Sequence, residues 1–149
     1  MKTNNIKSVF VLGLLLLAGF AVAALATATG PFYSLSSSAR NYVQCDHFTA
    51  QFGYNAVVQN TGSVPANLNG VLVDGVPFGL CETGQTYGAV YFPSSAVRSV
   101  EIFDPQGMGH CDYAGQSFQK TVTFNYRTPN GSGSQTQRMT FTCVGAKAS

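Results

Sequence analysis

Two short clusters in the sequence combine residue types that bind metals or take part in catalysis. Residues 45–47 read Cys-Asp-His and residues 110–112 read His-Cys-Asp. Zinc sites usually space their ligands as C-x₂₋₄-C or H-x₃₋₅-H, and neither cluster has that spacing. Adjacent residues of a strand also point to opposite faces, so each cluster presents only alternate residues to one side. We therefore expect no metal and no other cofactor.

The cysteines are better explained as disulfides. The chain has four of them: Cys45, Cys81, Cys111 and Cys143. An even number in an exported domain is typical of two bridges, and four cysteines allow three pairings. Two alternating segments at the C-terminal end are expected to pair as a hairpin, with Cys111 preceding the first segment and Cys143 ending the second. This arrangement favours Cys111–Cys143 and leaves Cys45–Cys81.

The patterns that usually identify enzymes do not occur in the sequence. Nucleophilic catalysis needs a base near the nucleophile and a third group to orient that base, but the chain has only two histidines and no Gly-x-Ser-x-Gly elbow. The glycines of residues 107–109 lack the spacing and the following helix of a phosphate-binding loop. We therefore predict that the protein is not an enzyme.

The distribution of charge argues against a nucleic-acid partner. Charged residues make up only 9% of the chain. Two of the eight basic residues, Lys2 and Lys7, lie near the N-terminus, which leaves six basic residues to face the six acidic ones. The remaining basic residues form no patch or stripe, which a nucleic-acid-binding surface would need. A nearly neutral domain has little colloidal repulsion, which suits a protein that assembles.

An apolar run, Val9–Ala26, follows the two N-terminal lysines and allows three interpretations. A secretory signal peptide would be cut at one of the small-x-small patterns between Ala21 and Ala28. A pilin-type leader would be cut just before Val9, and the apolar helix would be kept. A single-span anchor would remain in the membrane.

All three interpretations place the later part of the chain outside the cytoplasm. We therefore divide the protein into an N-terminal hydrophobic segment, residues 1–29, and an exported β domain, residues 30–149. The expected location is the cell surface or the extracellular space. Contact with a membrane is expected only during export or through the N-terminal segment.

The exported part shows the alternation and the turn residues of short β-strands. Five strands are predicted in its first two thirds: Tyr54–Gln59, Leu68–Val73, Val76–Leu80, Tyr87–Phe92 and Val97–Phe103. Asp74-Gly75 is a type I′ hairpin signal, and an alternating pair closes the chain. Residues 32–38 form either a linker or a first strand. The expected fold is mainly β, an Ig-like β-sandwich of about seven to eight strands preceded by one N-terminal hydrophobic helix, although the spacing also suits a partly closed barrel.

Residues 57–75 carry a resemblance to known proteins. They read Val-Val-Gln-Asn-Thr-Gly-Ser-Val-Pro-Ala-Asn-Leu-Asn-Gly-Val-Leu-Val-Asp-Gly. This frame of strand, turn, strand and hairpin resembles the β-sandwich domain of archaeal type IV pilins and related surface filament proteins, and is similar to matrix-fibre proteins of the camelysin and TasA type. The resemblance implies a secreted subunit, in which a strand from one copy can complete the sheet of the next.

We therefore predict a structural subunit of an extracellular filament, a pilus or a biofilm matrix fibre, whose partners are copies of itself. In a pilus, the apolar segment would pack in the filament core; in a matrix fibre, residues near 29–43 would add a strand to the next subunit. The predicted polymerisation residues are Val9, Leu12, Leu16, Phe20, Phe32 and Tyr33. The alternative is a monomeric surface module that binds a ligand or sugar. Asn130 begins an Asn-Gly-Ser glycosylation sequon.

Overall fold

The computed structural model describes residues 29–47, 52–104, 106–107 and 109–145, and within them the chain forms eight β-strands and no helix. The strands are β1 (Phe32–Arg40), β2 (Gly53–Asn60), β3 (Ala66–Val73), β4 (Val76–Glu82), β5 (Val90–Phe92), β6 (Val97–Phe103), β7 (Ser117–Thr128) and β8 (Gly131–Cys143). The predicted mainly β class is confirmed. The predicted N-terminal helix lies outside the described residues.

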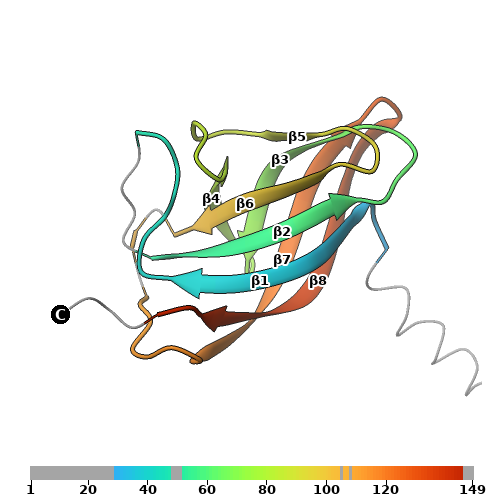
Figure 1. Ribbon diagram of the computed structural model, residues 1–149. Coiled ribbons are helices and arrows are strands. Elements are labelled where there is room, and N and C mark those ends of the chain that lie inside the picture. Colours follow the sequence, from blue (N-terminus) through green and yellow to red (C-terminus); the bar gives the residue numbers. More distant parts are fainter. Residues whose placement is uncertain (1–28, 48–51, 105, 108, 146–149) are drawn as a thin grey trace, which may run out of the picture.

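The eight strands belong to one sheet in the order β4-β6-β2-β1-β8-β7-β3-β5. Strand β4 also pairs with β3, so seven strands close into a barrel (Figure 1). The eighth strand, β5, pairs with the beginning of β3. The predicted sandwich of two sheets is therefore wrong. Alternation of apolar and polar residues fits both architectures, and the barrel is decided by β4, which pairs with β3 on one side and with β6 on the other.

The hairpin that makes this closure possible has the predicted turn. Asp74 and Gly75 have φ angles of 49° and 81°, as a type I′ turn requires. The Asp74 carboxylate accepts a 2.9 Å hydrogen bond from the backbone N–H of Thr121 in β7. This hydrogen bond is the main reason why the pKa of Asp74 is lowered. The turn is thus attached to the neighbouring strand as well as to its own hairpin.

The barrel interior is filled by alternate side chains of every long strand. Val122 and Phe124 of β7 are fully buried, and so is Phe141 of β8, as the alternation predicts. Phe32 of β1 packs edge-on against Phe92, with ring centroids 5.1 Å apart, and only 3% of its surface is exposed. Phe32, which we predicted to be a polymerisation residue, therefore lies in the core of its own barrel.

The turn that carries the family resemblance has a clear structural role. Asn60, at the end of β2, is fully buried. Its Nδ2 donates to the backbone carbonyls of Val64 (3.0 Å) and Phe92 (3.2 Å), and its Oδ1 accepts from the N–H of Gly62 (2.9 Å). One side chain thus satisfies three backbone groups, two in the loop after β2 and one at the end of β5.

The barrel closes along a seam between β1 and β8, where the pairing is parallel and short. Only Ser38↔Thr142 and Ala39↔Cys143 are paired there, whereas β1 pairs with β2 along its whole length apart from a bulge. Farther along the seam, the side chain of Gln135 hydrogen-bonds to the backbone of β1 in place of strand pairing. Its Oε1 accepts from the N–H of Phe32 (3.0 Å), and its Nε2 donates to the Phe32 carbonyl (2.6 Å). We call this contact the Gln135 clamp.

Removing the clamp should destabilise the barrel. Gln135→Ala leaves the backbone N–H and C=O of Phe32 without partners in a buried place, which costs about 2–4 kcal/mol. We expect this decrease in the free energy of unfolding in urea. The control is Gln119→Ala on β7, whose side chain makes one exposed hydrogen bond with Arg138. Equal stability losses in the two variants would contradict the role of the clamp.

Candidate assembly surface

The structure joins Cys45 to Cys81 and Cys111 to Cys143, which is the pairing that the sequence favours. Two disulfides in a small domain are typical of proteins that work in an oxidising, extracellular-type environment. None of the described residues belongs to a helix that is long and apolar enough to cross a membrane.

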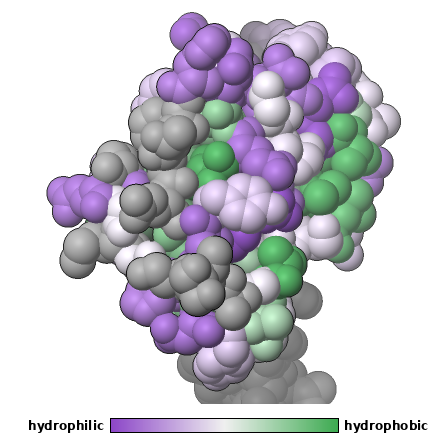
Figure 2. Space-filling view, turned by 60° about the vertical axis from the view of Figure 1, so that its left-hand side comes forward, coloured by the Kyte–Doolittle hydropathy of each residue, from purple (hydrophilic) through white to green (hydrophobic). Residues whose placement is uncertain are grey.

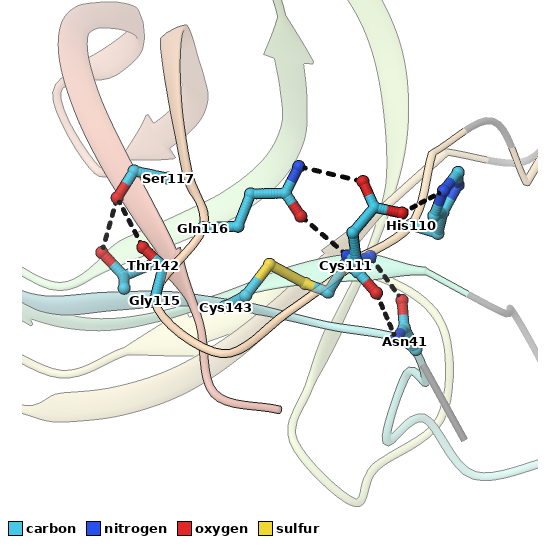
Figure 3. Close-up of a disulfide and its surroundings, with 9 residues drawn as sticks. Asn41, His110, Cys111, Gly115, Gln116, Ser117, Thr142 and Cys143 are labelled. Atoms are coloured by element: carbon cyan, nitrogen blue, oxygen red, sulfur yellow. Dashed lines mark hydrogen bonds and ion pairs between the residues drawn. A yellow bond between two sulfur atoms is a disulfide. The ribbon is translucent and has the colours of Figure 1, made fainter. Parts of the chain in front are cut away.

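The Cys111–Cys143 disulfide anchors three segments at one end of the barrel (Figure 3). Asn41, just after β1, holds the backbone of Cys111 from both sides: its Oδ1 accepts from the N–H at 2.6 Å, and its Nδ2 donates to the carbonyl at 3.1 Å. Gln116 accepts from the N–H of Asp112 at 2.7 Å. The loop between β6 and β7 is therefore tied to the ends of both β1 and β8.

The two clusters considered as metal or catalytic sites are surface pairs. His110 Nε2 lies 2.8 Å from Asp112 Oδ1, and His47 Nε2 lies 3.4 Å from Asp46 Oδ2. More than half of each of these four side chains is exposed, and the cysteine of each cluster is bound in a disulfide. Among the described residues, no group of three potential ligands comes together.

The outer face of β4, β6, β2 and β1 is divided into a covered half and an open half. In the covered half, the segment after β1 crosses the sheet and is fastened by Cys45–Cys81. Val43 and Phe103 pack with this disulfide in a small second core. A Cβ at Gly79 would collide with the Phe103 ring, and one at Gly53 would lie 2.7 Å from Val43, so both glycines make room for this outer layer.

The covered half also encloses a carboxylate. Glu101 is fully buried, and its Oε1 accepts from Asn55 Nδ2 at 3.3 Å and from Thr83 Oγ1 at 3.4 Å. Its Oε2 has no hydrogen-bond partner among the described residues. Burial raises the pKa of Glu101, and the positive charge of Arg40 and the hydrogen bonds from Asn55, Thr83 and the backbone of Gln44 offset this only in part.

The open half presents apolar side chains to solvent. Pairing places Tyr33, Gln59 and Val97 in one row across β1, β2 and β6, and Ser36, Val57 and Ser99 in the next. Leu35 lies at the bulge in β1. The exposed fractions are 60% for Tyr33, 50% for Leu35 and 43% for Val97, while Val57 is half-buried. We call Tyr33, Leu35, Val57 and Val97 the assembly face.

The two rows that carry the assembly face contain no charged residue. Figure 2 shows that the end of the molecule turned toward the viewer is mostly polar and that apolar residues gather in a group at its right-hand side. Exposed apolar residues that gather together, unlike single ones, mark surfaces that bind partners. Such a face suits contact with another protein surface better than catalysis.

The predicted polymerisation residues are only partly placed by the structure. Val9, Leu12, Leu16 and Phe20 lie outside the described residues, Phe32 is buried, and Tyr33 belongs to the assembly face. We did not predict the other residues of this face, Leu35, Val57 and Val97. The available signal was the apolar pair Val57-Val58, because a strand with apolar residues on both faces is covered on both sides or leaves one side to a partner.

The sequon residue Asn130 lies in the turn between β7 and β8. Its side chain is exposed, and its N–H donates to Thr128 Oγ1 at 3.1 Å. The position is accessible for glycan attachment.

No protein-family model matches the chain, and no curated protein matches it.

The buried carboxylate should make stability depend on pH. Because the folded protein holds the Glu101 proton more tightly than the unfolded chain, the free energy of unfolding should fall as the pH rises from the ordinary pKa of 4.5 through the raised folded value. Glu101→Gln should remove this slope and be more stable than the natural protein above that window. Urea unfolding at a series of pH values tests both expectations.

The matched control is Glu82→Gln, which removes a carboxylate that is 40% exposed and lies 3.5 Å from Arg98. This variant should keep the slope. An unchanged slope in Glu101→Gln would show that the buried carboxyl does not cause the pH dependence.

Proposed function

We propose that the chain is a structural subunit of an extracellular filament, a pilus or matrix fibre, built from copies of itself. The observation that supports this most directly is the assembly face, an exposed apolar surface on a disulfide-bonded barrel. A small exported domain gains nothing in stability from exposing Tyr33, Leu35 and Val97, whereas a subunit that buries them against a neighbour gains the free energy of removing them from water.

The charge of the domain supports the same proposal. Beyond the two N-terminal lysines, the six basic and six acidic residues balance. Copies of a neutral domain approach one another without net repulsion. Contact through the uncharged rows of the assembly face would bury no charged group of those rows. A contact between this face and a different surface of the next copy would not close on itself and would produce a fibre.

The strength of the seam between β1 and β8 determines whether copies could connect by exchanging β1. In the described fold β1 completes its own barrel, so the strand exchange implied by the family resemblance requires β1 to leave β8 and β2. The link to β8 is the weaker, with two paired residues, one hydrogen bond from Ser37 Oγ to the Thr140 carbonyl (2.6 Å) and the Gln135 clamp. Assembly of intact barrels through the assembly face needs no such opening.

Charge placed on the assembly face should prevent assembly. Tyr33→Asp and Leu35→Asp put a carboxylate on surface that a neighbour would cover, and burying an unpaired charge is costly. We expect filaments of the natural protein by electron microscopy, and a critical concentration at least about tenfold higher in each variant, which corresponds to about 1.4 kcal/mol per contact.

The control for these variants is Tyr91→Asp, because Tyr91 is 57% exposed but lies on β5, which carries none of the residues of the assembly face. It should assemble normally. If the natural protein stays monomeric at high concentration, with its native N-terminus and disulfides, the filament proposal is wrong. If all three variants assemble alike, the assembly face has no role.

A cross-link across the seam distinguishes the two modes of assembly. Ser38 and Thr142 are paired neighbours on β1 and β8, so Ser38→Cys with Thr142→Cys should form a third disulfide that keeps β1 in its own barrel. We expect the oxidised double variant to assemble as intact barrels through the assembly face. Assembly that appears only after reduction of this bond would instead establish strand exchange. The N-terminal sequence of the native protein, starting near Val9 or after Ala24, determines whether an apolar helix takes part.

A further inference from the structure

A shallow hollow lies on β3, β7 and β8. Its volume is about 370 Å³, and it is lined by Asn69, Asn125, Tyr126, Ser132, Gly133 and Ser134. The assembly face lies on β1, β2 and β6, so the two surfaces share no strand. An inference about the hollow therefore does not depend on filament formation.

The hollow exists because the sequence leaves out side chains and inserts one residue. A bulge between Leu68 and Gly70 adds Asn69 to β3. Gly70 pairs with Asn125. A Cβ at Gly70 would lie 3.7 Å from the Asn125 side chain, at ordinary van der Waals distance. Gly133 pairs with Tyr126, and its lack of a side chain makes room for the tyrosine ring, which packs against the core residue Phe32. Bulges and glycines inside strands often mark places where a ligand approaches the backbone closely.

The groups that face the hollow are neutral hydrogen-bonding groups. Ser134 Oγ donates to Asn125 Oδ1 at 2.6 Å, which fixes the orientation of the amide and turns Nδ2 toward the space above Gly70. Neither this Nδ2 nor the Asn69 amide has a hydrogen-bond partner among the described residues. Amides and hydroxyls both donate and accept, as the hydroxyls of a sugar do. Tyr126 also lines the hollow, and its ring packs against Phe32 of the core, with ring centroids 5.5 Å apart.

From these features we infer that the hollow binds a neutral saccharide. The site offers no apolar pocket for the side chain of a peptide, and no charged side chain lines it to hold a phosphate or a carboxylate. Arg127 is paired with Ser132 at the border but does not line the hollow. A shallow, open site of this kind gives weak binding per sugar, which many copies along a surface or fibre would add up.

The test is an NMR titration of the ¹⁵N-labelled mature protein with four separate neutral probes: cellotetraose, maltotetraose, mannotetraose and tetra-N-acetylchitotetraose, each to about 10 mM, a range suited to weak binding. For at least one probe we expect saturable shifts of the side-chain amides of Asn69 and Asn125 and of the backbone around Gly133. No shift at these residues with any probe would overturn the inference, as would shifts with an acidic oligosaccharide alone.

Filling the hollow should remove binding. Gly70 has ordinary strand conformation, and a Cβ there would make only an ordinary contact with Asn125, so Gly70→Thr should fold and weaken binding at least about tenfold. Asn69→Ala, which removes an exposed amide without affecting the core, should weaken binding too and replaces Gly70→Thr if that variant fails to fold. The control is Ala114→Asn, which adds similar bulk at an exposed position in the loop between β6 and β7. Unchanged affinity in the folded hollow variants would overturn the inference, whatever the protein does in assembly experiments.

Discussion

The structure depends on where β1 is inserted. An open sheet of seven strands would leave two edges of unpaired backbone N–H and C=O groups, and closure removes them. Here the first strand lies between β2 and the last strand, and it is parallel to β8, while every other pair in the sheet is antiparallel. The register Ala39↔Cys143 brings Asn41 to Cys111, beside the Cys111–Cys143 disulfide, and places Phe32 among the aromatic residues of the core.

This closure is secured by different means along its length. At one end the strands form true parallel pairs, and the Cys111–Cys143 disulfide covers them. At the other end, a side-chain amide substitutes for a peptide group, because Gln135 both donates to and accepts from the backbone of Phe32. A side chain can be released at lower cost than a ladder of backbone hydrogen bonds. The seam is thus the part of the barrel most suited to opening, and its strength determines whether copies could exchange strands or must bind as intact barrels.

Different strands form different parts of the outer surface. The segment after β1 covers half of the face formed by β4, β6, β2 and β1, buries Glu101 and is fixed by Cys45–Cys81. The other half remains open and apolar, which suits association between copies. On β3, β7 and β8, Gly70 and a bulge leave room for a neutral polar hollow. A filament subunit with this division would use one surface for its neighbours and keep the other surface free for an extracellular ligand.

The sequence by itself determined the local structure. Alternation determined β7 and β8, Asp74-Gly75 determined the hairpin, and the order of the cysteines along the terminal hairpin indicated the disulfide pairing, because each of these depends on residues close in the chain or on one paired turn. Only the tertiary structure decided that the sheet closes, that Phe32 faces inward while Tyr33 faces solvent, and that Leu35, Val57 and Val97 meet on one surface. The physical reason is that strand order and register depend on contacts between distant segments, and a pattern of period two is the same in a sandwich and in a barrel.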